Sequence, residues 1–450
     1  MKKFSDNFLE NISYSLKDKR WMIFILVILA ILVSLFFPTM LLRDSFQISS
    51  SVKKIYIAAN DTEALREIIR EFNEKNKGKI EVELIVFKYE KFSTNKKKEL
   101  ITRTMRSLNG KIDIFSIDQI WVPRIAKWSE DLRPYFSKED LSKLVKPALE
   151  TCVYDSTLCS IPLFLDLGIM YYRKDLISKL DNYKAIETKL MHGITWDELF
   201  QLSKQLNSKY SYVFQGKNYE GLICNYLEFL GGNSNYNNLD YFSSVNNDRT
   251  IAKLQFMQDL ILKEHLVPKQ VSTFEEASSF RYSIKNDIPF FRGWSTIYKL
   301  VKIEDEDSTK INYLGIAPLP HFESEKSVST IGGWNLMVSR YSNVKKEAVK
   351  FLKFTMSEAA QKILYSREEY LPVIKSIYSD SLFISKYPRI KFYSERLEQI
   401  VRRPFIEDYT RLSDVLAFYI NQTLKGNFKA QEALNAAQRD LNKILTNQYK

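Results

Sequence analysis

The chain has 450 residues, of which 45% are hydrophobic and 27% are charged, and its net charge is +12. These values are typical of a globular protein, and the length suffices for two or more domains. Basic residues are spread along the sequence and no glycine-rich phosphate loop occurs, so we expect neither a nucleic-acid-binding nor a nucleotide-binding protein. The histidines, His192, His265 and His321, are far apart, which argues against a histidine-based metal centre, and we expect no cofactor.

The first predicted element is an apolar segment near the N-terminus. Residues 21–42 contain no charge, and a helix of this length, rising about 1.5 Å per residue, crosses a hydrocarbon core of roughly 30 Å. Basic residues at 17–20 favour a cytoplasmic N-terminus. A cleaved signal peptide is the alternative, but its apolar part is usually only about 7–15 residues long and ends at small residues. We therefore predict a cytoplasmic segment 1–20, a transmembrane anchor 21–42 and a linker 43–52, with all later residues outside the cytoplasm.

Patterns of strands and helices alternate beyond the linker. Residues 53–60, 79–87 and 111–118 each predict a strand, with helical patterns between them. This alternation predicts an α/β fold with a parallel-rich sheet. Ligands of such sheets bind beyond the carboxyl ends of the strands, which is where Asn60 and Asp118 fall.

Two cysteines bracket a short segment in the next part of the chain. Cys152 and Cys159 are separated by Val-Tyr-Asp-Ser-Thr-Leu, which suggests a small hairpin or loop. Because an oxidising compartment permits disulfides, we predict one between them, and two reduced, buried thiols are the alternative. Cys224 has no evident partner and is expected in the core.

A mostly helical region opens near Thr195 and Glu198, which have the spacing of a capping box. Residues 315–320 are again extended, and Gly333 and Trp334 then precede an apolar run. Glycine permits a close backbone approach to a ligand, and a tryptophan ring offers a flat surface for stacking. The alternative is a tight turn that enters a buried strand, with the tryptophan in the core.

Seven motifs occur in the order found in a known family: DIFSIDQIW, IPLFLDLGIMYYRKDL, YVFQGKNYEGLICNYLEFL, FFRGWSTIY, GIAPLPHF, IGGWNLMVSRYSN and RRPFIEDY. Over about residues 53–448 the sequence resembles the family 1 extracellular solute-binding proteins of ABC sugar importers, and most of all their trehalose/maltose-binding group. The resemblance implies a two-lobed, class II periplasmic-binding-protein fold whose lobes close on a sugar by hinge bending. It also implies a monomer that works with ABC permease subunits and is not an enzyme.

The resemblance implies three crossings between the lobes. They are expected near residues 162–166, 316–318 and 366–370. Lobe 1 is then predicted to comprise 53–165 and 317–365, and lobe 2 to comprise 166–316 and 366–450.

A sugar site combines planar polar groups for the hydroxyls with aromatic rings for the apolar sugar faces. By resemblance, the candidate ligand-binding residues are Glu63, Asp118, Asp166, Tyr219, Trp294, Gly333, Trp334 and Arg403. The resemblance implies that the two tryptophans stack on the sugar from opposite lobes. It also implies that Asp118, Asp166 and Arg403 bind hydroxyl groups.

Each candidate has a structural alternative. Asp118 has the position of a helix N-cap, Asp166 that of a structural hydrogen-bonding group and Arg403 that of a surface ion pair. The aromatic candidates are alternatively core residues. Glu63 is the weakest candidate because Asn60 and Asp61 align almost as well. A lobe 1 arginine of the relatives falls in the lysine run 96–98, and lysine cannot form the same bidentate fork.

The favoured function is a membrane-tethered receptor that captures a di- or oligosaccharide resembling trehalose, maltose, sucrose or glucosylglycerol and delivers it to an ABC permease. An enzyme on the same scaffold is the first alternative, with a cysteine nucleophile as in thiaminases or paired carboxylates as in glycosidases. Cys224 has no histidine nearby in the sequence, which disfavours the former. A tethered sugar sensor is the second alternative.

Overall fold

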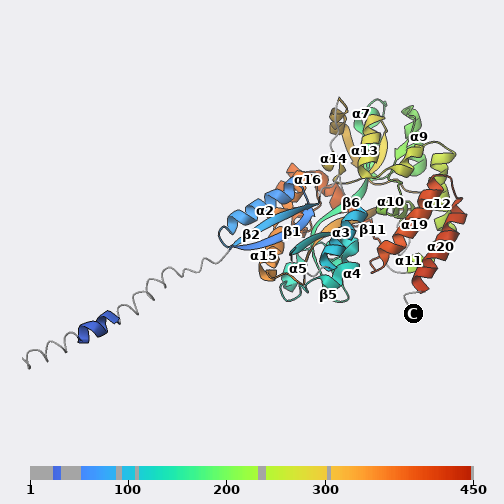
Figure 1. Ribbon diagram of the computed structural model, residues 1–450. Coiled ribbons are helices and arrows are strands. Elements are labelled where there is room, and N and C mark those ends of the chain that lie inside the picture. The colour runs from blue at the N-terminus through green and yellow to red at the C-terminus, as the bar shows by residue number, and fades with distance from the viewer. Residues whose placement is uncertain are drawn as a thin grey trace, which may run out of the picture. The chain divides into compact units, whose positions relative to one another are not determined.

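The computed structural model describes residues 24–31, 52–87, 94–106, 111–231, 240–301 and 306–446 (Figure 1). The chain forms two units, Met1–Lys53 and Lys54–Lys450. In the first unit, residues 24–31 are helical, and the rest of the predicted anchor 21–42 lies outside the described residues. Among the described residues, no helix has both the length and the apolar character needed to cross a membrane.

The second unit is built on a nine-stranded sheet of described residues. Its strands are β1 (Lys53–Asn60), β2 (Ile80–Phe87), β3 (Ile114–Asp118), β6 (Ile161–Arg173), β7 (Tyr212–Val213), β8 (Phe290–Trp294), β9 (Leu314–Ala317), β10 (Ser329–Val338) and β11 (Ile400–Val401). They follow the order β2-β1-β3-β10-β6-β8-β7, with β9 paired to β6 and β11 to β10. The three strands predicted before residue 120 are therefore confirmed.

The sheet is mixed rather than parallel-rich. β1 and β3 are parallel, as are β7 and β8, but β10 runs antiparallel to both β3 and β6. β6 is also antiparallel to β8 and β9. The prediction missed this because the pattern of β6 is an almost continuous apolar run, which gives a strand but not the direction of its neighbours.

β6 is the longest strand and joins the two halves of the sheet. Its residues up to Leu167 pair with β10, and its residues from Gly168 pair with β8 and β9. A side chain at Gly168 would overlap the Glu228 carboxylate and the Arg292 guanidinium group. Glycine at the change of partner therefore leaves room for that ion pair.

Helices cover the sheet on both sides of this junction. They are α2 (Glu63–Lys75), α3 (Thr94–Arg106), α4 (Val122–Ile125), α5 (Lys138–Ser142), α6 (Lys146–Glu150), α7 (Lys174–Ile177), α8 (Tyr183–His192), α9 (Trp196–Gln205), α10 (Glu220–Leu230), α11 (Asp240–Ser243), α12 (Asp248–Leu262), α13 (Glu276–Lys285), α14 (Ile297–Leu300), α15 (Lys345–Thr355), α16 (Glu358–Glu368), α17 (Ser381–Lys386), α18 (Arg389–Arg396), α19 (Tyr409–Leu424) and α20 (Ala430–Thr446). Figure 1 shows α19 and α20 side by side next to α12, and α2 along β1 and β2. The predicted capping box is confirmed at the start of α9, where Thr195 and Glu198 bond reciprocally.

The segment between β9 and β10 packs on the helices. The backbone N–H of His321 donates to Ile194, its carbonyl accepts from Trp196, and Glu325 pairs with Lys253 of α12 at 3.0 Å. These contacts hold residues 321–325, which were predicted to belong to lobe 1, against α9 and α12, which were predicted to belong to lobe 2. The lobe bounds stay a prediction.

The predicted disulfide is wrong in this structure, because Cys152 and Cys159 are free thiols. They flank the hairpin of β4 (Val153–Tyr154) and β5 (Thr157–Leu158), and the Cys159 N–H donates to the Cys152 carbonyl at 2.9 Å. The two thiols contact different backbone carbonyls, Cys152 that of Ala148 and Cys159 that of Thr157. Burial raises the pKa of Cys152 to about 12 and also raises that of Cys159.

Candidate functional site

A cavity of about 120 Å³ lies at the ends of β3 and β8 and beside the middle of β6, between β10 and the starts of α10 and α13. Seven of the eight candidate residues line it: Asp118, Asp166, Tyr219, Trp294, Gly333, Trp334 and Arg403. The sequence did not single out the other lining side chains, which are Phe164, Glu220, Cys224, Glu276, Thr296, Ile297 and Tyr370. Gly221 and Gly332 complete the wall together with Asn60, which the sequence analysis placed at a strand end.

Glu63 does not belong to this cavity, and that prediction is corrected. It is the first residue of α2, its side chain is exposed, and it pairs with Arg367 at 3.2 Å. Asn60, the last residue of β1, lines the cavity instead. The difference follows from position, because a strand end points at the ligand region while the first turn of the next helix has already left it. The side chains of residues 96–98 lie outside the described part.

Arg403 forms the centre of a buried polar cluster. Its Nη2 lies 3.1 Å from Asp118 Oδ1 and its Nη1 lies 3.1 Å from Glu220 Oε1, and the side chain is only 3% exposed. The hydroxyls of Tyr409 and Ser413 also donate to Glu220. Burial raises the pKa of Glu220, and the charge of Arg403 opposes that shift. Arg403 is therefore no surface ion pair, and it joins the end of β3 to the start of α10.

Asp118 lines the cavity and also has its structural alternative, the role of a helix N-cap. Its Oδ1 accepts from the Ile120 N–H at 3.1 Å, which caps the short 3-10 helix Gln119–Trp121, and the same oxygen accepts from Arg403. Within the residues that the structure describes, Oδ2 makes no hydrogen bond. One oxygen thus fixes the carboxylate while the other faces no protein donor.

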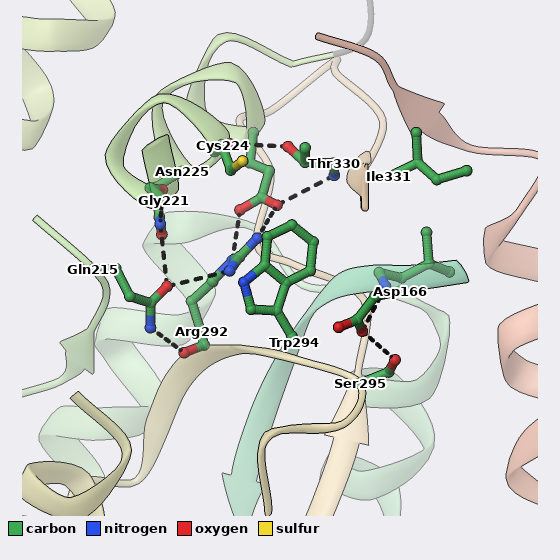
Figure 2. A network of polar contacts seen from close by, with 12 residues as sticks. Asp166, Gln215, Gly221, Cys224, Asn225, Arg292, Trp294, Ser295, Thr330 and Ile331 are labelled. Atoms are coloured by element: carbon green, nitrogen blue, oxygen red, sulfur yellow. Dashed lines mark hydrogen bonds and ion pairs between the residues drawn. The ribbon is translucent and has the colours of Figure 1, made fainter. Parts of the chain in front are cut away.

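Asp166 is held by neutral donors. Its Oδ1 accepts from the Leu167 N–H at 3.0 Å and from the Ser295 hydroxyl (Figure 2). Its Oδ2 accepts from the Thr296 hydroxyl at 3.1 Å. Burial raises the pKa of Asp166 to about 6, against the effect of these hydrogen bonds and of Arg292. The carboxylate is fixed at the wall of the cavity without a salt bridge to any described residue.

Trp294 is supported by a buried ion pair. Arg292 and Glu228 form two parallel contacts of 2.8 and 3.1 Å, and the guanidinium group lies 4.1 Å from the indole ring. The indole N–H donates to Glu276 Oε1 at 3.3 Å. Such a bidentate pair is rigid, and a cation over an aromatic ring attracts it electrostatically. The ring is therefore held on one face and at its N–H.

Further polar groups, two side chains and one backbone N–H, surround that ion pair (Figure 2). Gln215 accepts from Arg292 at 3.2 Å and from Asn225 at 3.1 Å, and it donates to the Arg292 carbonyl. Glu228 also accepts from the backbone N–H of Thr330 at the start of β10. The orientation of Trp294 on β8 is thus coupled to α10 and β10.

The two glycines of the GGW motif serve the fold as well as the cavity. Gly333 has φ 150°, and a Cβ atom there would lie 2.6 Å from the Phe164 carbonyl oxygen. The backbone at Gly333 therefore lies close to β6, whereas the sequence analysis expected it to lie close to a ligand. A Cβ atom at Gly332 would lie 3.0 Å from the Trp294 ring. Trp334 is half-buried and packs edge-on against Trp121 at 5.7 Å, so it has both core and cavity contacts.

Further aromatic side chains enlarge the apolar part of the wall. Phe164 and Tyr370 stack at 3.6 Å with an angle of 15° between their rings. Phe164 precedes Asp166 by two residues on β6, so strand alternation puts both on one face and offered a signal that the prediction missed. Tyr370 comes from a distant segment and had no such signal. The ring of Tyr219 lies over Gly221, where a side chain would overlap it.

The cavity combines ring surfaces with carboxylates and one guanidinium group, which is the chemistry that binds polyhydroxylated molecules. Burial raises the pKa of the Cys224 thiol, so the reactive thiolate is disfavoured there. Among the described residues, no group of three or more His, Cys, Asp or Glu side chains is arranged to hold a metal ion.

Comparison with known proteins agrees with this chemistry. Over 346 residues the chain is 27% identical to a probable ABC transporter-binding protein of Deinococcus radiodurans. This alignment covers 74% of this chain and 80% of that protein. It is 24% identical over 259 residues to the galactooligosaccharide-binding protein of Bacillus subtilis, covering 55% of this chain and 57% of that one. The maltose-bound structure of T. maritima MalE3 superposes with a TM-score of 0.77 at 26% identity, covering 87% of this chain and all of that one.

These similarities support the two-lobed α/β fold of periplasmic binding proteins. They are to substrate-binding proteins rather than to enzymes, and they support an ABC sugar-transport role outside the cytoplasm. Residues 58–362 match the family described as bacterial extracellular solute-binding protein. Since that match covers more than half of the chain, the chain belongs to the bacterial extracellular solute-binding proteins.

Proposed function

We propose that this protein captures a di- or oligosaccharide in the cavity between Trp294 and Trp334 and delivers it to an ABC permease. The observation that carries the proposal is the convergence of both tryptophans with Asp118, Asp166 and Arg403 on one cavity. The similarity to the maltose-bound T. maritima protein and to the galactooligosaccharide-binding protein of Bacillus subtilis supports an oligosaccharide ligand.

Binding follows from the complementarity of the wall. The tryptophan rings cover the apolar faces of the sugar, and burying such a face contributes roughly 25 cal/mol per Å². Asp118 Oδ2 and the Asp166 carboxylate accept hydrogen bonds from hydroxyl groups, and Arg403 donates through its unpartnered Nε. Because this Nε is buried and has no acceptor among the described residues, a sugar oxygen that reaches it gains a hydrogen bond at little extra desolvation.

The lobes close by bending where single strands pass between them. β6 is continuous through the junction, so a small change of its twist rotates one half of the sheet against the other. The predicted lobes, 53–165 with 317–365 and 166–316 with 366–450, move as the two bodies of this hinge.

The protein is tethered to the cytoplasmic or plasma membrane by residues 21–42, with the binding unit facing the periplasm or the cell exterior. The charge-free sequence of this segment motivates the proposal. Membranes washed at alkaline pH should retain the protein, and peptide mapping of the retained chain should recover residues 1–20. A washed-off chain that begins near residue 45 would contradict the tether.

A sugar screen tests the binding function. Purified full-length protein is heated with trehalose, maltose, sucrose, glucosylglycerol or galactooligosaccharides, and hits are titrated by calorimetry. A ligand at 100 times its Kd should stabilise the native state by about 2.7 kcal/mol. Glu63→Gln, which changes an exposed carboxylate outside the cavity, is the matched control and should bind as the wild type does. Failure of all these sugars to raise the melting temperature at millimolar concentration would overturn the proposal.

A further inference from the structure

The carboxylates around the cavity outnumber its cations. Asp118, Asp166, Glu220 and Glu276 line it, and Arg403 is the lining guanidinium group. Arg403 already pairs with Asp118 and Glu220, at 3.1 Å each. Within the described residues, neither Asp166 nor Glu276 forms a salt bridge.

The nearest further cation is already neutralised. Arg292 lies behind Trp294, but Glu228 holds it with two contacts of 2.8 and 3.1 Å. Both members of that pair are nearly inaccessible to solvent, at 1% and 5% exposure. Around the cavity, five carboxylates therefore face two guanidinium groups.

The two carboxylates without a salt bridge both bond to the segment from Trp294 to Thr296. Glu276 accepts from the indole N–H of Trp294, while Asp166 accepts from the hydroxyls of Ser295 and Thr296, the next two residues along the chain. Both therefore lie beside the same tryptophan. An aromatic ring with flanking carboxylates is a favourable environment for an organic cation, because the ring quadrupole and the negative charges attract it together.

An excess of buried negative charge has a cost that folding alone does not remove. A carboxylate taken out of water without a cation is destabilised, and it either binds a proton or meets a positive charge. Burial raises the pKa of Asp166 to about 6 and raises that of Glu276. Asp166 is therefore still largely ionised at neutral pH. The described residues also lack the arrangement for a metal ion that would balance the charge.

We propose that the preferred ligand is a sugar with a protonated amine, and that this amine binds beside Trp294 against Asp166 and Glu276. The proposal rests on the sugar-binding function and specifies its ligand. The hydroxyl groups of the same ligand bind at the Arg403 side, where Asp118 Oδ2 and Arg403 Nε have no partner within the described residues.

Calorimetric titration of the full-length protein with matched ligands tests the amine. The disaccharide of two β-1,4-linked glucosamines is compared with cellobiose, which has hydroxyls in place of the amines, and with its diacetylated form, which has lost the charge. Glucosamine and glucose form a second pair. In low salt the amino sugar of each pair should bind at least tenfold more tightly than the neutral sugar. This difference in affinity should shrink at higher salt, because salt screens the attraction between the ammonium group and the carboxylates. Choline serves as an ammonium without a sugar and should bind more weakly than the amino sugars.

Variants separate the amine from the sugar. Glu276→Gln should weaken the amino sugar at least tenfold while changing the affinity for a neutral sugar less than threefold, and Glu63→Gln should change neither. Asp166→Asn also alters an acceptor for hydroxyl groups, so it should weaken both ligands, the amino sugar at least tenfold more than the neutral sugar. Either variant suffices if the other fails to fold. If each neutral sugar binds as tightly as the amino sugar of its pair, this inference is overturned and the proposed function still stands. The absence of binding by every sugar, charged or neutral, would overturn both.

Discussion

The buried carboxylates are bonded differently on the two sides of the cavity. At the Arg403 side, Asp118 and Glu220 share one guanidinium group, and two hydroxyls complete the bonding of Glu220. At the Trp294 side, Asp166 is bonded by neutral donors alone. On the first side the charged groups pair with one another and link two elements, whereas on the second side the carboxylates have no salt bridge among the described residues. The difference suggests that one side contributes to stability and the other to ligand selection.

Removal of the shared cation is expected to have the largest effect. Arg403→Met leaves Asp118 and Glu220 buried without a cation, which should destabilise the fold by about 3–5 kcal/mol. Urea unfolding of the full-length protein measures this. Arg402→Met is the control, because Arg402 is 30% exposed and pairs with Glu150 at the rim, where an ion pair contributes about 0–1 kcal/mol. Equal effects of the two substitutions would show that the Arg403 side is not a stabilising cluster.

The Trp294 side should make stability depend on pH through Asp166. Its pKa is raised from 3.8 to about 6 in the folded protein, so the native state binds more protons than the unfolded state between these values. The contribution of protonated Asp166 is complete below about pH 4 and is lost as pH rises through about 6. Asp166→Asn should therefore become more stable relative to wild type by at most about 3 kcal/mol between pH 4 and pH 7. Denaturation curves at both pH values test this, and a constant difference would contradict it.

Loss of one stacking ring should weaken binding more than folding. Trp294→Ala or Trp334→Ala removes roughly 1–3 kcal/mol of apolar burial on the ligand, or about tenfold to a hundredfold in affinity. Titration of each variant with the best sugar from the screen measures this. Trp128→Ala is the control, because Trp128 contacts Lys127 and Arg106 and does not line the cavity. If Trp334→Ala unfolds the protein or binds as the wild type does, its ring belongs to the core.

The smallest effect is expected at the cysteines, away from the charged groups of either side. Because Cys152 and Cys159 are free, a reducing agent should leave the melting temperature unchanged within about 1 °C. A native disulfide usually contributes about 2–5 kcal/mol, so its reduction would lower the melting temperature by several degrees. Such a fall would show that the thiols are paired in the purified protein.

Sequence patterns predicted what depends on neighbours along the chain. β1 and β3 end at Asn60 and Asp118, as the alternation of strands and helices indicated, and both residues line the cavity. Trp294, Trp334 and Arg403 came from motif resemblance, and they also line it. Local periodicity thus locates the end of a strand, and resemblance to a family motif identifies individual side chains of the site.

The features that the sequence did not predict depend on contacts between segments that are far apart in the chain. Arg292 and Glu228 are 64 residues apart, and neither has a local pattern that marks an ion pair. Tyr370 reaches the cavity only because it stacks on Phe164. The disulfide was mispredicted because sequence spacing predicts a hairpin but does not show which groups the two thiols contact.

A crystal structure of the protein with the tightest-binding sugar from the screen tests the central claim most directly. The account predicts the sugar between Trp294 and Trp334, with a hydroxyl on Asp118 Oδ2 and a polar group against Asp166. A sugar bound elsewhere, such as in the groove lined by Phe136 and Lys353, would contradict it.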